Sequence, residues 1–440
     1  MGIKVCKFGG TSMANAEAMK RARDIVLSDK ERKFVVVSAP GKRTKSDEKI
    51  TDLLIRCQVE AKESGDCSKT FAIIEERFVE IVKDLGLDFD ILNVLKETKK
   101  EINANCETKD FAASRGEYLS ARIFACLLGF EFVDSADLVL FDEDGKFDSE
   151  GTNYNVGNVL EKVEKAVIPG FYGKTYGRKI KIFSRGGSDI SGSIVARGVN
   201  ADIYENWTDV CGVLACDPRI VDNPKKIDRL SYKELRELSY MGASVLHADA
   251  IFPVRKGRIP INIKNTFEPS DSGTFILPTE KYTPTGDLIT GIAGMKGFTV
   301  IFIDKSMMNS ELGFARKVLE VLESNKISFE HMPSGIDTMS IVVSKAEVDG
   351  RLDKVIDEIK QAVKPDHIFV KEDISLIATV GHGMANKIGT SARLFTALSK
   401  AKINVLLIDQ GSSELNIIVG VKDSDYEDTV RAIYNEFFCE

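Results

Sequence analysis

Apolar and polar positions at the start of the chain predict a strand, a turn, a helix and a second strand. Residues 3–8 are mostly apolar and precede the glycines of GGTS, which interrupt the apolar pattern. Ala18, Ala22 and Ile25 then recur at helical spacing and share one face of the predicted helix. The run FVVVSA at residues 34–39 follows as a second strand. This order is typical of a βαβ unit.

The same alternation of strands and helices continues to about residue 265. Uninterrupted apolar strands such as FVVV suit a sheet that is covered by helices on both faces. Residues 1–265 are therefore predicted to form one α/β domain with a mainly parallel central sheet. Residues 266–289 are rich in Pro, Ser, Thr and Gly, which favour turns, and we interpret them as a linker.

Two similar units follow this linker, at residues 290–368 and 369–440. Each opens with an alternating strand and continues with an amphipathic helix, a polar turn and a second strand. In the first copy, Val318 and Leu322 share the apolar face of the helix. A further strand and a final helix complete the βαββαβ order of a ferredoxin-like unit in both copies. The pattern indicates an internal duplication.

Composition narrows the class of protein without identifying it. A chain of 440 residues exceeds the size at which one core keeps growing, so two or three domains are expected. The formal net charge of -7 argues against nucleic acid as the main partner. The sequence shows neither a signal peptide nor a membrane span, and we expect a cytoplasmic protein. Eight scattered cysteines and four distant histidines predict neither a zinc site nor disulfides.

The first candidate site is the string KFGGTS at residues 7–12. The common GxxxxGK[ST] phosphate loop and the HRD and DFG signatures of protein kinases are absent from the sequence. Lys7 ends the first predicted strand, and Gly9 and Gly10 allow the backbone to approach an anion closely. Lys7 is placed to neutralise charge on a transferring phosphoryl group. An ordinary glycine turn beside a solvated lysine is the alternative interpretation.

The string FSRGGSD repeats this geometry before a second predicted helix. Arg185 offers a planar fork for a carboxylate, and Asp189 can hold a cation or a lysine in place. An aspartate at a helix start is more commonly a cap, so the prediction depends on the whole string.

Three further segments carry polar residues at element ends. Thr208 and Asp209 follow the strand DIYENW, where nucleotides bind in parallel sheets, and Arg219 lies in the later string DPR. Glu117 in SRGE can receive an ammonium group, although an acid in the first turn of a helix also suits the helix dipole. Thr51 is equally compatible with a helix cap and with a hydroxyl facing a substrate.

Taken together and in order, these strings resemble the aspartate kinases of the amino-acid kinase family. The resemblance rests on KFGGTS, SAPGK with TDLL, SRGE, the pair Gly170 and Phe171, SRGGSD, TDVCGV and DPRIV, and it spans nearly the whole chain. The duplicated C-terminal unit is similar to the paired ACT domains that these kinases carry.

The resemblance implies a transfer of the γ-phosphoryl group of ATP to the β-carboxylate of L-aspartate. Lys7 would be the principal electrostatic catalyst, Asp189 would organise the centre, and Arg185 would grip a carboxylate. No protein metal site is implied, because Mg²⁺ would arrive with ATP. The ATP site would comprise Lys7, Gly9, Gly10, Thr208, Asp209 and Arg219. The substrate site would comprise Ser38, Thr51, Glu117, Phe171, Arg185 and Ser188.

The resemblance also implies feedback regulation by an end-product amino acid, lysine first and threonine second, bound between ACT units of paired subunits. A homodimer or homotetramer formed through the ACT domains, and a place at the start of lysine, threonine and methionine biosynthesis, are expected on the same ground. Acidic residues on a solvated surface are the alternative for this site. The candidate lining is Met308, Ser310, Glu311, Ser328, Phe329, Glu330 and Asp337.

Two positions depart from the family pattern. Ser244 in GASVLHADA replaces a lysine that can help to bind phosphate, and Leu214 replaces an aromatic residue common in the nucleotide loop. Two alternatives therefore remain at this stage. One is a sibling kinase acting on acetylglutamate, glutamate or a nucleoside monophosphate, and the other is a catalytically inactive amino-acid sensor.

Overall fold

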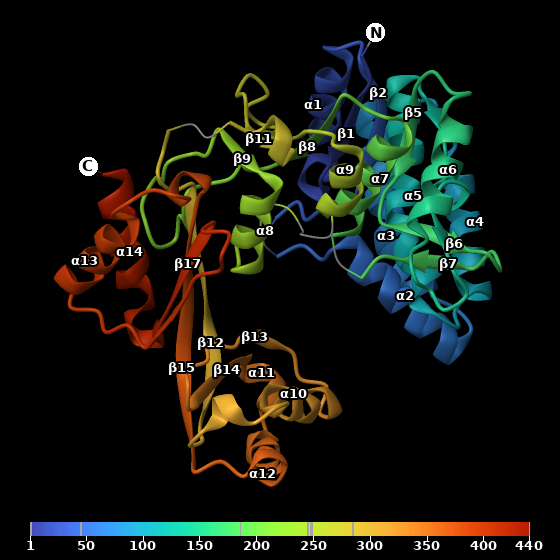
Figure 1. The fold of residues 1–440 in the computed structure, drawn as a ribbon. Helices are drawn as coiled ribbons and strands as arrows, with labels where there is room; N and C mark the ends of the chain where they lie inside the picture. The colour runs from blue at the N-terminus through green and yellow to red at the C-terminus, as the bar shows by residue number, and fades with distance from the viewer. Residues whose placement is uncertain are drawn as a thin grey trace. The chain divides into compact units, whose positions relative to one another are not determined.

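The chain forms two compact bodies, which Figure 1 shows as a ribbon. The structure is a computed structural model that describes residues 2–44, 46–184, 186–243, 246, 250–283 and 286–439. The first body comprises Met1–Val213, Lys226–Leu235 and Ser244–Thr283, and the second comprises Leu214–Lys225, Arg236–Ala243 and Pro284–Glu440. Each body is therefore built from three separate stretches of the sequence, and each is described below by itself.

An eight-stranded sheet of described residues forms the centre of the first body. Neighbouring strands run parallel except for β10 and β11, which are antiparallel. The predicted α/β fold with a mainly parallel sheet is thus confirmed. In spatial order the strands are β3 (Glu131–Phe132), β5 (Ala166–Pro169), β2 (Arg32–Val37), β1 (Lys4–Phe8), β8 (Ile203–Thr208), β10 (Ile261–Asn265), β11 (Thr274–Leu277) and β9 (Arg229–Ser231).

Helices and a small sheet complete the first body. The helix predicted from Ala18, Ala22 and Ile25 is α1, and all three side chains are buried. The helices are α1 (Ala16–Leu27), α2 (Ile50–Ser64), α3 (Ser68–Leu85), α4 (Ile91–Ala104), α5 (Lys109–Leu128), α6 (Ser149–Leu160), α7 (Gly187–Gly198), α8 (Tyr232–Tyr240), whose last residues belong to the second body, and α9 (Ile251–Gly257). The small sheet consists of β4 (Leu140–Phe141), β6 (Tyr172–Thr175) and β7 (Ile180–Ile182).

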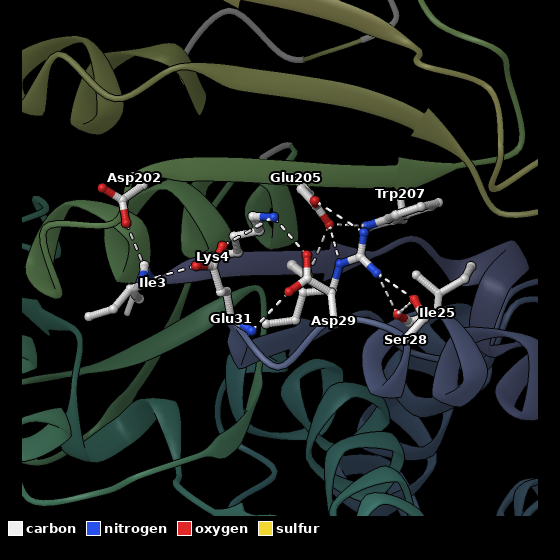
Figure 2. A network of polar contacts seen from close by, with 12 residues as sticks. Ile3, Lys4, Ile25, Ser28, Asp29, Glu31, Asp202, Glu205 and Trp207 are labelled. Atoms are coloured by element: carbon white, nitrogen blue, oxygen red, sulfur yellow. Dashed lines mark hydrogen bonds and ion pairs between the residues drawn. The ribbon is translucent and has the colours of Figure 1, made fainter.

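A buried ion pair ties the middle strands of the large sheet together (Figure 2). Arg32 on β2 donates from Nε and Nη2 to the two carboxylate oxygens of Glu205 on β8, at 2.8 and 3.2 Å. The Trp207 indole donates to the same carboxylate at 2.9 Å, so both charged groups of the pair have hydrogen-bond partners. Lys4 on β1 pairs with Asp29 nearby at 2.6 Å. Replacing either Arg32 or Glu205 would leave the other charge buried and unpaired, which is strongly destabilising.

The segment interpreted as a linker contributes a strand to this sheet. Within residues 266–289, β11 lies between β10 and β9 and is not an edge strand. Thr274 and Ile276 are fully buried and alternate with more accessible neighbours. The Pro- and Ser-rich composition did not predict this strand, because only four residues carry the alternating pattern.

The second body is built on one six-stranded sheet of described residues. Its order is β13 (Phe329–His331), β14 (Thr338–Ser344), β12 (Gly291–Asp304), β15 (His367–Val380), β17 (Asn416–Lys422) and β16 (Leu407–Asp409). The helices are α10 (Phe314–Ser324), α11 (Lys345–Val348), α12 (Leu352–Val363), α13 (Thr390–Lys400) and α14 (Tyr426–Phe438). Val318 and Leu322 are buried on α10, as the helical spacing predicted.

The two ferredoxin-like units share the long strands β12 and β15, which run side by side in Figure 1. The later part of β12 pairs with β14, whereas its first residues pair only with β15 among the described strands. The later part of β15 pairs with β17. The second unit therefore includes the first residues of β12, although the sequence pattern placed these residues in the first unit. A register shift between Met295 and Phe298 marks the change from one unit to the other.

No helix among the described residues is long and apolar enough to cross a membrane. The described cysteines are all free thiols.

Candidate active site

A buried lysine, an aspartate and an asparagine meet at the centre of the large sheet. Lys7 lies near the end of β1, is 7% exposed, and places Nζ 2.5 Å from Asp189 Oδ1. Asn206 lies opposite Lys7 on β8 and donates from Nδ2 to Asp189 Oδ1 at 3.0 Å. Lys7 Nζ in turn donates to Asn206 Oδ1 at 3.5 Å. The three side chains hold one positive charge at a fixed place beside the start of α7.

Asp189 lies in the first turn of α7 but does not cap the helix. The N-cap residue is Gly186, which adopts a left-handed backbone with φ 59°. The Asp189 carboxylate instead pairs with Lys7 and Asn206, so the cap alternative is wrong for this residue. The Tyr204 hydroxyl donates to the Asp189 carbonyl at 3.1 Å, which ties the same turn to β8.

The glycines after β1 form a turn that leaves the backbone beside Lys7 uncovered. A Cβ on Gly9 would have Lys7 Nζ as its nearest neighbour, at 3.7 Å. Gly10 opens a short 3₁₀ turn, η1 (Gly10–Met13), and packs directly on Gly41. A Cβ on Gly41 would lie 2.6 Å from the Gly10 carbonyl carbon, so two stretches of backbone meet where a side chain would clash. A glycine backbone, which carries no side chain, can approach a phosphate closely.

Thr208 and Asp209 lie beside this turn. The Thr11 hydroxyl donates to Asp209 Oδ2 at 3.0 Å, and the Thr208 hydroxyl donates to Oδ1 at 3.3 Å. Thr266 donates to the Thr208 carbonyl from its backbone nitrogen and its hydroxyl, at 2.8 and 3.0 Å. Ser12 Oγ lies 2.7 Å from Thr266 Oγ1. The structure thus brings the predicted phosphate turn and the TD loop into one hydrogen-bonded group.

Arg219 and Leu214 belong to the second body, unlike the other predicted nucleotide residues. Arg219 pairs with Asp217 at 2.6 Å, and its side chain is 87% exposed. Its assignment to the ATP site stays a prediction.

Glu117 has a strongly shifted carboxyl pKa and lies among the proposed substrate residues. It projects from α5, is 6% exposed, and its Oε2 has no hydrogen-bond partner among the described residues. Burial raises the pKa of the Glu117 carboxyl to about 8, against the opposing effects of the Ala39 backbone and of Arg115. An uncharged acid with a free oxygen is poised to ionise when a cation arrives.

Phe171 and Ser188 are brought together by close packing around two glycines. Phe171 has a positive φ of 79°, and its backbone nitrogen donates to the Ser191 hydroxyl at 2.9 Å. A Cβ on Gly170 would lie 2.8 Å from Ser188 Oγ, and one on Gly187 would lie 2.5 Å from the Phe171 ring. The loop before β6 therefore lies directly against the start of α7.

The remaining predicted residues are placed as follows. The Ser38 backbone nitrogen donates to the Phe8 carbonyl at 3.1 Å, so Ser38 follows β2 beside the end of β1. Thr51 is not the N-cap of α2, because that position is Lys49. Arg185 and Ser244 lie outside the described residues.

No group of three or more His, Cys, Asp or Glu side chains among the described residues could hold a metal ion.

The predicted effector residues gather around two segments of the second body, and their acids already have partners. Glu311 accepts from Lys317 at 2.7 Å and pairs with Lys305 at 3.2 Å, and these contacts lower the pKa of the Glu311 carboxyl. Asp337 Oδ1 accepts the Met307 backbone nitrogen at 2.8 Å, and Glu330 accepts from the Tyr240 hydroxyl at the end of α8. Met308 is buried, whereas Phe329 is 43% exposed. Ser310 donates to Asn309, and the Ser328 nitrogen donates to Glu347.

The sequence interpretation missed Asn206, Tyr204 and Thr266. Asn206 had a usable signal, because an asparagine near the end of the predicted strand DIYENW must find polar partners when buried. Thr266 had none, since its partners lie far away in the sequence.

Comparison with known proteins places these observations in a family. The pattern of the amino acid kinase family matches residues 2–265, and that of an ACT domain matches residues 377–437. Aspartokinase 3 of Bacillus subtilis is 38% identical over 451 residues, covering 99% of both chains.

Two solved structures extend the comparison. The Clostridium acetobutylicum aspartate kinase, described as an allosteric enzyme, is 52% identical, with a TM-score of 0.94 over 99% of this chain and 100% of that one. The fold is also that of Escherichia coli aspartokinase III, solved with aspartate and ADP, with a TM-score of 0.77 at 24% identity over 99% of this chain and 100% of that one.

Proposed function

Because the chain belongs to the amino acid kinase family and is an aspartate kinase within it, we propose that its first body transfers the γ-phosphoryl group of MgATP to the β-carboxylate of L-aspartate. A carboxylate oxygen of aspartate attacks the γ-phosphorus, and the bond to the β,γ-bridging oxygen breaks. ADP leaves with that electron pair, and 4-phospho-L-aspartate is the second product. This reaction would start lysine, threonine and methionine biosynthesis.

The observation that carries this proposal is the buried group of Lys7, Asp189 and Asn206 beside the Gly9–Gly10 turn. The nucleophile is already ionised at neutral pH, so the reaction needs no strong general base. It needs alignment and charge neutralisation, which a fixed cation in a site of low dielectric supplies. Asp189 and Asn206 hold the Lys7 ammonium in place before the substrates arrive.

The roles of the other residues follow the family resemblance, together with position where the structure describes the residue. The Gly9–Gly10 backbone with Lys7 would bind the phosphates, and Thr208 and Asp209, joined to Thr11, would close the nucleotide side. When bound, Mg²⁺ would neutralise charge on the β- and γ-phosphates, with Asp209 as the adjacent protein oxygen. We assign Arg219 to the same site and Arg185 to a substrate carboxylate. Ser38, Thr51, Phe171 and Ser188 would complete the aspartate pocket.

Glu117 would bind the α-ammonium group of aspartate. Its uncharged state in the empty site has a physical reason, since ionisation without a partner would leave a charge in a buried place. Substrate binding would then displace the proton and form a charge-assisted contact.

We also propose that the second body senses an end-product amino acid, lysine before threonine. Glu311, Glu330 and Asp337 supply acidic groups around one part of the first repeat. A cytoplasmic homodimer or homotetramer joined through the ACT repeats belongs to the same proposal. So does the domain division 1–265, 266–289, 290–368 and 369–440, in which the segment 266–289 adds β11 to the sheet of the first body.

One assay tests substrate and control together. ATP-dependent hydroxamate formation in hydroxylamine would be measured with L-aspartate, acetylglutamate and glutamate, each with and without lysine or threonine. We expect product with aspartate and with neither of the other two acids, and we expect added lysine to suppress it. Product with another acid but not with aspartate would reject the proposed substrate.

A further inference from the structure

A buried arginine outside the proposed site holds two of its loops together. Arg77 projects from the middle of α3 and is 3% exposed. Its Nη2 donates to the carbonyl of Gly41 and, at 3.5 Å, to the carbonyl of Ala14. Its Nη1 donates to the Glu48 carbonyl at 3.3 Å and lies 3.1 Å from Asp47 Oδ2. One planar guanidinium thus joins helix α3 to three carbonyl groups and one carboxylate, which belong to two other segments.

These two segments contain the residues assigned to phosphate and substrate. Ala14 directly follows η1, the turn that begins with Gly10. Gly41, Asp47 and Glu48 belong to the described residues 38–44 and 46–49, called here the β2–α2 loop, which begins with Ser38 and leads into α2. Arg77 therefore contacts both segments.

The loop and the turn also meet directly. The Gly41 nitrogen donates to the Gly10 carbonyl at 2.8 Å, and the two glycines are packed so closely that neither has room for a Cβ without adjustment. Gly41 accepts a hydrogen bond from Arg77 at its carbonyl and donates one to Gly10 from its nitrogen. The positions of the Gly41 and Gly10 peptides therefore depend on each other. A displacement of the guanidinium would be transmitted to the phosphate turn through one residue.

A purely structural role explains these contacts poorly. Burial lowers the pKa of the Arg77 guanidinium, and its Nε has no hydrogen-bond partner among the described residues. Burying a cation with incomplete pairing is costly, and apolar residues of similar volume commonly stabilise a fold as well or better. What an apolar side chain cannot do is hold several carbonyl groups in a fixed planar arrangement.

We propose that Arg77 is a positioning residue for phosphoryl transfer, which fixes the β2–α2 loop against the Gly9–Gly10 turn and thereby sets the geometry of the phosphate site. The inference rests on the proposed function, because it takes Gly9 and Gly10 as phosphate contacts. Arg77 acts through Gly41 and Ala14.

The test compares Arg77→Lys and Arg77→Ala with the wild-type protein in the hydroxamate assay. A lysine cannot reproduce the planar fork, and a displacement of about 1 Å in a catalytic site can cost about 100-fold. We therefore expect kcat/KM for ATP to fall by about 100-fold in Arg77→Ala and by about tenfold in Arg77→Lys. Added guanidinium ion at millimolar concentration should restore part of the activity of Arg77→Ala.

Arg197→Ala is the matched control. Arg197 is also largely buried, but it joins the last turn of α7 to Ser149 and Glu150 at the start of α6. Arg197 lies eight residues beyond Asp189 on α7, about 12 Å along the helix axis. Arg197→Ala should lower the melting temperature with little change in kcat/KM and no response to guanidinium.

The outcomes separate this inference from the proposed function. Arg77→Lys with a lowered melting temperature but wild-type kcat/KM would show a structural role only, and this variant decides the matter if Arg77→Ala does not fold. Failure of guanidinium to restore a folded Arg77→Ala would also contradict the inference. A parallel Lys7→Met variant checks its premise: if that variant is fully active, the proposed phosphate site itself is wrong.

Discussion

At the scale of single residues, the proposed role of Glu117 would couple substrate binding to pH. Its carboxyl has a pKa of about 8 instead of 4.5, because burial penalises the charged form. Between these two values the folded protein keeps a proton that the unfolded chain releases. By linkage, the contribution of Glu117 to stability decreases as the pH rises through that window and is fully lost above pH 8.

We expect the apparent affinity for L-aspartate to rise with pH until about pH 8. Below this pKa, deprotonation of Glu117 should cost about tenfold in affinity per pH unit. The measurement is KM for aspartate between pH 6 and 9 in the wild type and in Glu117→Gln. The variant should bind aspartate weakly at every pH and show a flat profile. A wild-type KM that does not change with pH would remove Glu117 from the ammonium site.

Candidate residues could be recognised in the sequence where a motif is local, and not where partners come from distant segments. Lys7, Gly9 and Gly10 stand in one string, and the structure places Lys7 beside Asp189. Arg77 gave no signal, because an arginine in an amphipathic helix is normally a solvated residue. Only the fold shows that its guanidinium reaches Gly41 and Glu48.

At the level of elements, we propose that two glycine turns set the geometry of the phosphate site. Gly10 and Gly41 come from different loops and meet backbone to backbone. Their spacing leaves no room for a methyl group, so the requirement for glycine at Gly41 comes from packing between loops.

Gly41→Ala tests this close approach. The added Cβ would lie 2.6 Å from the Gly10 carbonyl carbon and 2.9 Å from the Thr11 nitrogen, so the turn must shift. We expect kcat/KM for ATP to fall by about 100-fold in a protein that still folds. Gly411→Ala is the matched control, since its Cβ would meet nothing closer than Ser413 Oγ at 3.9 Å. Equal kinetics in the two variants would contradict the proposed role of the turn.

Most elements were predicted correctly where the hydrophobic period is long. The helices α1 and α10 bury the residues that their spacing indicated. The strand β11 was missed because it is short and lies in a composition typical of turns. The sharing of β12 between two repeats was also missed, because strand pairing depends on contacts between distant parts of the chain.

At the scale of the whole chain, two short segments, Leu214–Lys225 and Arg236–Ala243, belong to the second body. The residues directly before, between and after them belong to the first body. The stretch Leu214–Lys225 follows the TD loop in the sequence but is built into the second body, where the Ile292 nitrogen donates to the Ala215 carbonyl at 2.7 Å. The last turn of α8 also belongs to the second body, through Tyr240 and Glu330. The repeated units were predictable from periodicity, whereas this exchange of segments required the structure.

Glu330→Ala tests the proposed regulation. Loss of a hydrogen bond to a charged group is worth about 1.5–3 kcal/mol, so the lysine concentration for half inhibition should rise at least about tenfold. Turnover without lysine should change little. Glu323→Ala, an exposed acid on α10, is the matched control and should keep normal inhibition. Unchanged inhibition in Glu330→Ala would exclude Glu330 from the effector site.

The most direct test of the central claim is the turnover of Lys7→Met with L-aspartate and ATP, compared with Lys4→Met. Both lysines lie on β1, but Lys4 pairs with Asp29, whereas Lys7 pairs with Asp189 beside the phosphate turn. Removing a preorganised charge should lower kcat by about 100-fold to 1,000-fold in Lys7→Met, with the fold preserved and Lys4→Met near normal. Wild-type turnover in a folded Lys7→Met would contradict the account.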